Sequence, residues 1–151
     1  VRKSVADYVR GRWSGIAIGQ GRVVTTLDLP EVYPSVYRFS PDGTRLYVTT
    51  AATGKGEQHD NINMDSLLVY DATALPELKL LREVKVGVAD CGRRPIGFDP
   101  QGRYIFIPNP TDATVSILDS ADDTVLETIC VGDDPAGDVN FSFWRGDVYG
   151  A

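Results

Sequence analysis

The sequence is poor in the residues that most often carry catalysis, metal binding or disulfide chemistry. Its 151 residues include one histidine, two cysteines and one methionine. It has no zinc-type Cys/His spacing, no Ser/His/Asp set in a recognisable local context and no Gly-x-Gly-x-x-Gly fingerprint. The acid pair Asp122 and Asp123 falls in a turn between two apolar runs, where we expect both carboxylates to be solvated. The commonest hydrolase, metalloenzyme and dinucleotide-binding patterns are therefore not found.

Long apolar runs and an excess of basic charge are also missing. No stretch approaches the roughly 18 apolar residues that a membrane-spanning helix needs, so no membrane span is predicted. The chain carries 15 Lys and Arg against 21 Asp and Glu, a net charge of −6, which disfavours nucleic acid as a partner because phosphates call for a basic surface. No secretory leader is recognisable, but the chain begins with Val1 and not Met, as a processed or truncated product would.

What the sequence does contain is an internal repeat. Residues 39–50 are echoed by residues 98–109, and each copy is followed by an apolar segment that ends in an acidic turn. Residues 41–43 and 100–102 fit tight hairpin turns, in which proline sets φ and glycine takes a positive φ. A repeat of strand signals and Pro/Gly turns predicts a β-propeller of four-stranded blades. The strands expected in two complete blades are 34–39, 45–50, 66–71 and 80–86, then 95–98, 104–109, 114–119 and 125–131.

The predicted fold is all-β: a partial propeller with two complete blades and a half-blade at each end. No long helix is expected beyond residue 12. The expected division is an N-terminal segment with a possible short helix (1–12), an outer half-blade (13–30), a blade (31–86), a second blade (87–132) and an inner half-blade (133–151).

About three blades cannot close a ring, since closed propellers need roughly four or more. We therefore expect either a longer propeller or self-association, in which two copies would share half-blades in a six-bladed ring. An isolated monomer is not expected, because terminal blades would leave apolar faces and unpaired edges at residues 24–29 and 139–143.

The largest departure from the repeat is an insertion at residues 51–65, between the second and third strands of the first complete blade. Insertions on a rigid β scaffold often carry recognition, and this one holds the only histidine. Asn61, Asn63 and Asp65 alternate like calcium ligands, but the loop glycine and closing Glu of an EF-hand are missing. We predict a partner-binding loop, mobile unless covered, and no catalytic, cofactor-binding or metal-binding residue. The candidate contact residues are Lys55, Glu57, Gln58, His59, Asp60, Asn61, Asn63 and Asp65.

The two cysteines leave three alternatives open. Cys91 stands beside Arg93, whose charge would favour a reactive thiolate, and Cys130 ends an outer strand. A disulfide between Cys91 and Cys130 requires an oxidising compartment and a suitable distance. We expect two independent thiols.

Residues 46–50 and 105–109 resemble the Tyr-Val-Thr-Asn (YVTN) class of propeller repeats found in secreted bacterial and archaeal proteins. From Tyr33 to about Cys130 a narrower likeness appears: a Ser-Pro-Asp-Gly hairpin, a strand, a charged insertion, and then residues 66–76. In this order the chain resembles the heavy chain of periplasmic quinoprotein amine dehydrogenases. The resemblance implies a seven-bladed propeller without a redox cofactor of its own, the tryptophylquinone residing on a separate small subunit, and a periplasmic or otherwise extracytoplasmic location.

Two functions follow as hypotheses. The first is a non-catalytic scaffold or interaction subunit of an extracytoplasmic assembly, with other protein chains as partners. The alternative is a fragment or subunit of an amine-dehydrogenase-like redox enzyme, taking part in electron transfer with a cofactor on another chain. In neither case is this chain alone expected to be an enzyme.

Overall fold

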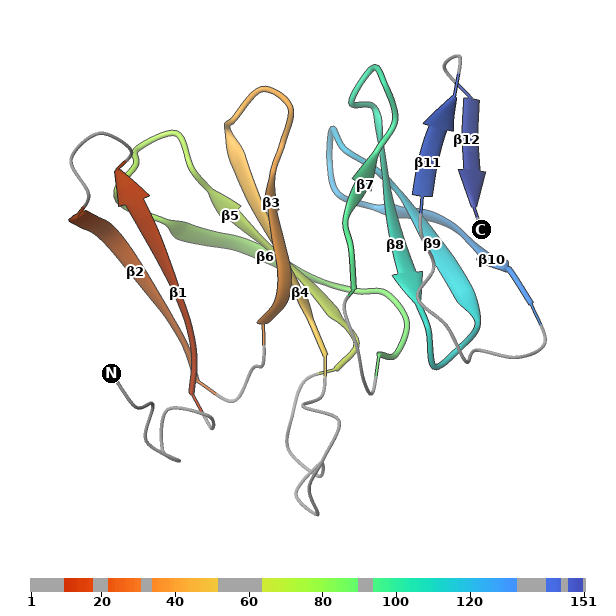
Figure 1. Ribbon diagram of the computed structural model, residues 1–151, viewed down its shortest axis with the longest axis horizontal. Coiled ribbons are helices and arrows are strands. Elements are labelled where there is room, and N and C mark those ends of the chain that lie inside the picture. Colours follow the sequence, from red (N-terminus) through yellow and green to blue (C-terminus); the bar gives the residue numbers. More distant parts are fainter. Residues whose placement is uncertain are drawn as a thin grey trace.

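The computed structural model describes residues 10–17, 22–30, 34–51, 64–89, 94–132, 141–144 and 147–150. These residues form twelve β-strands and no helix, arranged as two four-stranded and two two-stranded antiparallel sheets (Figure 1). The described part of the chain therefore contains no helix that is long and apolar enough to cross a membrane. The all-β partial propeller predicted from the repeat is confirmed.

The two four-stranded sheets are the complete blades. In each, strands follow one another in chain order across the sheet, as they do in a propeller blade. The first blade comprises β3 (Pro34–Phe39), β4 (Arg45–Thr50), β5 (Ser66–Asp71) and β6 (Lys79–Lys85). The second comprises β7 (Gly97–Phe98), β8 (Tyr104–Asn109), β9 (Thr114–Asp119) and β10 (Val125–Cys130).

The two-stranded sheets lie at either side of the complete blades (Figure 1). The first pairs β1 (Arg10–Ala17) with β2 (Arg22–Pro30), and the second pairs β11 (Phe141–Trp144) with β12 (Asp147–Gly150). They correspond to the two half-blades expected at the chain ends. Trp144 is the last residue of β11.

One part of the sequence-based prediction is wrong. Arg10 opens strand β1 opposite Pro30, so residues 10–12 are extended and do not belong to an N-terminal helix. They pair with β2 because the antiparallel ladder continues beyond the Trp13–Leu27 pair at which the half-blade was expected to start. Residues 1–9, the rest of that segment, lie outside the described residues.

The hairpin turns behave as their sequences require. Gly43 and Gly102 have φ values of 74° and 69°, the left-handed region that a side chain disfavours. At the first turn the Asp42 carboxylate accepts hydrogen bonds from the Ser40 hydroxyl at 2.5 Å and the Thr44 amide at 3.0 Å. These bonds lower the pKa of Asp42 to about 2. The carboxylate that caps the turn therefore stays ionised until the pH falls to about 2.

The two complete blades share one hydrophobic core. Side chains of β4 and β5 interlock with side chains of β7, β8 and β9; the buried members are Tyr47, Leu67, Val69, Ile96, Phe98, Ile105, Ile107 and Leu118. On the other face of the first blade lies a second cluster of Leu46, Val48, Leu68, Tyr70 and Ala72. The first blade is therefore apolar on both faces, as a blade between two neighbours must be. Polar side chains gather at the two ends of the shared interface.

Candidate functional site at the base of the insertion

Of the eight candidate contact residues, the structure describes only Asp65. The other seven lie in residues 52–63, outside the described part of the chain. The Asp65 carboxylate lies 2.7 Å from the Lys85 ammonium on β6, and the Asp65 carbonyl accepts from the Val86 amide at 2.8 Å. The base of the insertion is thereby joined to the outer strand of its own blade.

Arg94 lies at the centre of the base of the insertion. It lies in the connection between β6 and β7, just before the second blade begins, and its side chain is fully buried in the interface between blades. Its Nε donates to the Pro108 carbonyl at 3.1 Å, and one terminal nitrogen donates to the Gly87 carbonyl at 2.5 Å and to the Asn109 side-chain oxygen. A buried guanidinium is thus held mainly by main-chain oxygens.

The same guanidinium holds both ends of the insertion. Its other terminal nitrogen donates to the Thr50 carbonyl and to the Met64 carbonyl, both at 3.2 Å. Thr50 is the last residue of β4 and Met64 is the described residue that precedes Asp65 and β5. One side chain from the connection between the two blades therefore fixes the points where the insertion leaves and re-enters the first blade.

Asn109 and Gly87 complete the base. The Asn109 side-chain oxygen also accepts from the Gly87 amide at 3.1 Å, and its amide nitrogen donates to the hydroxyls of Thr114 and Ser116, each at 2.9 Å. A Cβ on Gly87 would lie 2.5 Å from Asn109 Cγ and 2.6 Å from an Asp112 carboxylate oxygen, so only glycine fits without a shift. The loops of both blades meet here at close quarters.

Electrostatics make Arg94 a structural cation. Burial lowers the pKa of Arg94 to about 10, while the charges of Asp65 and Asp112 act in the opposite direction. A pKa near 10 leaves the guanidinium protonated at neutral pH. Asp112 itself accepts a hydrogen bond from the Val88 amide at 2.6 Å. With its nitrogens engaged by protein oxygens, Arg94 organises the loops and does not offer a free group for chemistry.

The opposite end of the same interface holds four charged or polar side chains that we call the inter-blade clamp: Arg45, Tyr47 and Arg82 of the first blade and Asp123 of the second. One Asp123 carboxylate oxygen accepts from Arg45 at 2.9 Å and from the Tyr47 hydroxyl at 2.8 Å. The other oxygen lies 3.6 Å from Arg82 Nε. Asp123 is only 2% exposed, so its charge is compensated by the neighbouring blade rather than by water.

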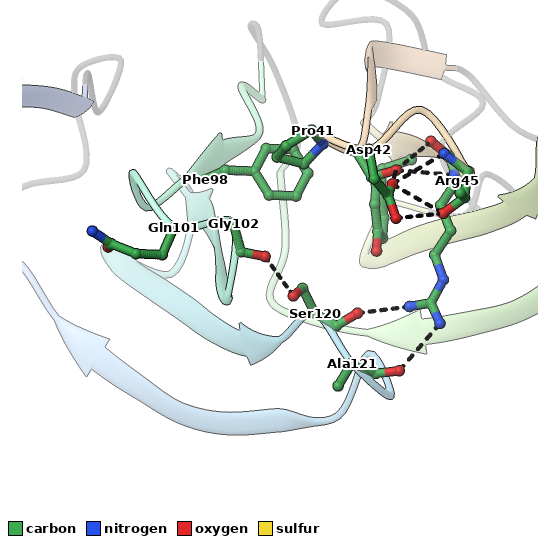
Figure 2. A pocket seen from close by; sticks show the side chains of 11 residues that line it. Pro41, Asp42, Arg45, Phe98, Gln101, Gly102, Ser120 and Ala121 are labelled. Atoms are coloured by element: carbon green, nitrogen blue, oxygen red, sulfur yellow. Dashed lines mark hydrogen bonds between the residues drawn. The ribbon is translucent and has the colours of Figure 1, made fainter.

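The turn that carries Asp123 also presents its carbonyls to the arginines. Arg45 donates to the carbonyls of Ser120 at 2.7 Å and Ala121 at 3.1 Å. Figure 2 draws both hydrogen bonds. Arg82 donates to the Asp122 carbonyl. A hollow of about 390 Å³ opens beside this contact, between the turns at Pro41 and Gly102 (Figure 2). Its charged side chains, Asp42 and Arg45, are already paired within the protein, which favours a structural role for this end.

Titration of Tyr47 provides a test of the clamp. Burial raises the pKa of Tyr47 to about 12, from about 10 in an unfolded chain. The neutral phenol is therefore favoured by folding, and this stabilisation is complete below pH 10 and lost as the pH rises from 10 to 12. We expect the stability advantage of the wild type over Tyr47→Phe to shrink by about 1.4 kcal/mol between pH 8.5 and 11 in urea titrations. A difference that stays constant with pH would contradict the buried phenol, and Tyr70 cancels because it is present in both proteins.

Sequence reasoning missed these two polar clusters. The acid pair at 122–123 was expected to be solvated, which is correct for the exposed Asp122 and wrong for Asp123, because the turn inserts Asp123 under the neighbouring blade. Asn109 had a signal, since it ends the second copy of the repeat where Thr50 ends the first. Arg94 had none, because nothing in its neighbours distinguishes a buried arginine from a solvated one.

The structure leaves the cysteine alternatives open. Cys130 is a free, exposed thiol at the end of β10, and Cys91 lies outside the described residues. Within the described ranges, no three His, Cys, Asp or Glu side chains gather in a way that would hold a metal ion.

Comparison with known proteins identifies a fold and no family. No family model matches the chain, and no curated protein matches it by sequence. Among solved structures it is similar to Kuenenia stuttgartiensis hydrazine synthase, with a TM-score of 0.62 and 16% identity over 95% of this chain and 52% of that chain. It is also similar to the Pseudomonas aeruginosa periplasmic gluconolactonase PpgL (TM-score 0.60, 21% identity, 83% of this chain and 35% of that chain).

A third match is the Swd1 β-propeller domain of Myceliophteria thermophila, with a TM-score of 0.54, 12% identity and coverage of 81% of this chain and 37% of that chain. The fold class defined by these neighbours is the β-propeller. The chain spans between about a third and a half of the length of these three structures. At such identities the likeness concerns the fold alone, and the narrower resemblance to YVTN repeats and to amine dehydrogenase heavy chains stays a hypothesis.

Proposed function

We propose that this chain is a non-catalytic propeller segment that acts as an interaction subunit of an extracytoplasmic protein assembly, with the insertion at residues 51–65 contacting a partner chain. The observation that carries the proposal is the set of hydrogen bonds that Arg94 makes at the base of the insertion. A buried guanidinium that bonds the carbonyls of Thr50 and Met64 fixes both ends of the insertion to the rigid inter-blade core. A loop whose ends are fixed loses less conformational entropy on binding, which favours recognition.

The composition of the insertion supports a protein partner. It contributes lysine, glutamate, histidine and amides in place of core residues, a mixture suited to the polar rim of a protein interface. The extracytoplasmic location is supported by the resemblance to secreted propeller repeats and by a fold neighbour that is a periplasmic enzyme.

Replacing residues 54–63 by a Gly/Ser segment of equal length tests the proposal. We expect the wild-type protein, purified from its natural host, to carry a stoichiometric partner chain, and the replaced protein to lose that chain while its thermal unfolding midpoint changes little. The matched control is Gln101→Ala, which alters an exposed side chain at the opposite end of the blades. Retention of the partner after loop replacement would refute the proposal.

The same purified complex distinguishes the alternative function. A quinone or haem absorption band that co-purifies with the chain would assign it to a redox enzyme whose cofactor lies on another chain. The interaction-subunit proposal expects a spectrum of protein alone. Chemical cross-links between Lys55 and the partner chain would identify the loop as the contact in either case.

A further inference from the structure

Strand β10 is the outer edge of the second blade, and all six of its residues are exposed. Within the described ranges its only strand neighbour is β9. Large apolar side chains stand along it: Leu126 is 55% exposed, Ile129 is 42% exposed, and Val131, which follows the strand, is 50% exposed. An exposed edge with apolar side chains and free main-chain groups is a template for pairing with another strand.

The corresponding edge of the first blade is protected. Strand β6 is also an outer strand, but charged residues occupy four of its seven positions, namely Lys79, Arg82, Glu83 and Lys85. Strand β10 has a single charge, Glu127, among six residues. Charged side chains are the usual means of preventing edge-to-edge pairing. The two edges of one chain therefore differ in the feature that controls strand addition.

The main-chain groups of β10 that face outward follow from the ladder with β9. The Val131 amide donates to the Ala113 carbonyl at 2.9 Å, so the amide of Val131 faces β9. Main-chain amides point to alternate sides along a strand. The amide of Ile129 therefore also faces β9, while the amides of Thr128 and Cys130 point away from it. The register shift between Val125 and Glu127 lies outside this central segment.

We propose that β10 pairs antiparallel with β10 of a second copy of this chain, about a two-fold axis at Thr128. In that register the outward amide of each Thr128 would donate to the Thr128 carbonyl of the other copy, Leu126 lies opposite Cys130, and Val125 lies opposite Val131. Glu127 lies opposite Ile129 of the other copy, so the only charge of the strand does not face its own equivalent. An interface that places the same surface patch of two copies together must be self-complementary in this way.

The proposal does not depend on the insertion and concerns a different surface. It also makes a prediction about salt. Two copies with a net charge of −6 each repel at long range, and added salt screens that repulsion. The dimer should therefore tighten between about 20 mM and 300 mM NaCl, the opposite of an interface that depends on opposite charges.

Thr128→Pro and Thr128→Lys test the edge directly. Proline at a position whose amide points outward leaves the ladder with β9 intact and removes the central donor. We expect the wild-type 151-residue chain to show a monomer–dimer equilibrium by sedimentation, and both variants to weaken it by about tenfold or more. The matched control is Leu81→Lys, which adds the same charge at a 45% exposed position of β6 and should leave the equilibrium unchanged.

A cysteine probe locates the two-fold axis. In a chain carrying Cys91→Ser and Cys130→Ser, Thr128→Cys should form an intermolecular disulfide on mild oxidation, because directly opposed strand residues have the Cα separation that a disulfide spans. Glu127→Cys in the same background should cross-link much more slowly. A wild-type chain that stays monomeric up to 100 µM, a dimer unaffected by the Thr128 variants, or equal cross-linking at 127 and 128 would each overturn the proposal.

Discussion

Arg94→Ala is expected to lower the free energy of unfolding by about 4 kcal/mol, the largest effect of any single substitution considered for this chain. The substitution leaves the carbonyls of Thr50, Met64 and Pro108 without this donor inside a buried interface. A buried polar group that loses its partner costs about 1–3 kcal/mol, and water entering the smaller side chain's space recovers part of the loss. Urea unfolding followed by tryptophan fluorescence and circular dichroism measures the change.

The location of the damage is as informative as its size. Amide exchange should increase first at Val86 and Ala89, whose amides donate to the carbonyls of Asp65 and Met64 at the base of the insertion. Arg103→Ala is the matched control, since the Arg103 side chain is exposed and lies over the Tyr104 ring at 5.4 Å, so it should cost less than about 0.5 kcal/mol. A loss below 1 kcal/mol for Arg94→Ala would contradict the role assigned to the guanidinium.

Asp123→Ala is expected to lower the free energy of unfolding by about 3 kcal/mol. Removing one partner of a buried ion pair is costly because the other charges keep their desolvation without compensation. Arg45 retains 24% side-chain exposure and Arg82 47%, which reduces the cost relative to a fully buried pair. Asp123 also has a φ of 60°, a conformation that Asp and Asn tolerate better than alanine. Denaturant unfolding again supplies the measurement.

Two companion variants separate charge from backbone. Asp123→Asn keeps the side-chain shape and the tolerance for positive φ, so it should lose less than Asp123→Ala and isolate the ion pair. A double-mutant cycle with Arg45→Met should give a coupling energy of about 1–2 kcal/mol, whereas a cycle with Arg103→Met should give none. If the effects of Asp123→Ala and Arg45→Met on the free energy of unfolding were additive, the two side chains of the inter-blade clamp would not be energetically coupled.

Local sequence predicted the strands because their signals are local. The first blade's β4 and β5 and the second blade's β8 and β9 occupy the predicted residues, since apolar runs bounded by Pro/Gly turns leave little freedom in where a strand begins. Gly43 and Gly102 take the positive φ that their turns require. Errors fall at strand ends and at the N-terminal segment, where ladder pairing with β2 extends β1 back to Arg10.

The sequence by itself therefore determined an all-β chain, the repeat of four-stranded blades and the position of the insertion at 51–65. Only the tertiary structure decided which polar residues are buried, because burial of Arg94 and Asp123 depends on contacts with residues of the first blade that are far away in the sequence. Arg94 meets Thr50 across 44 residues and Asp123 meets Arg45 across 78. Periodicity and turn chemistry report on a residue's own strand, whereas these pairs exist only where two blades pack face to face.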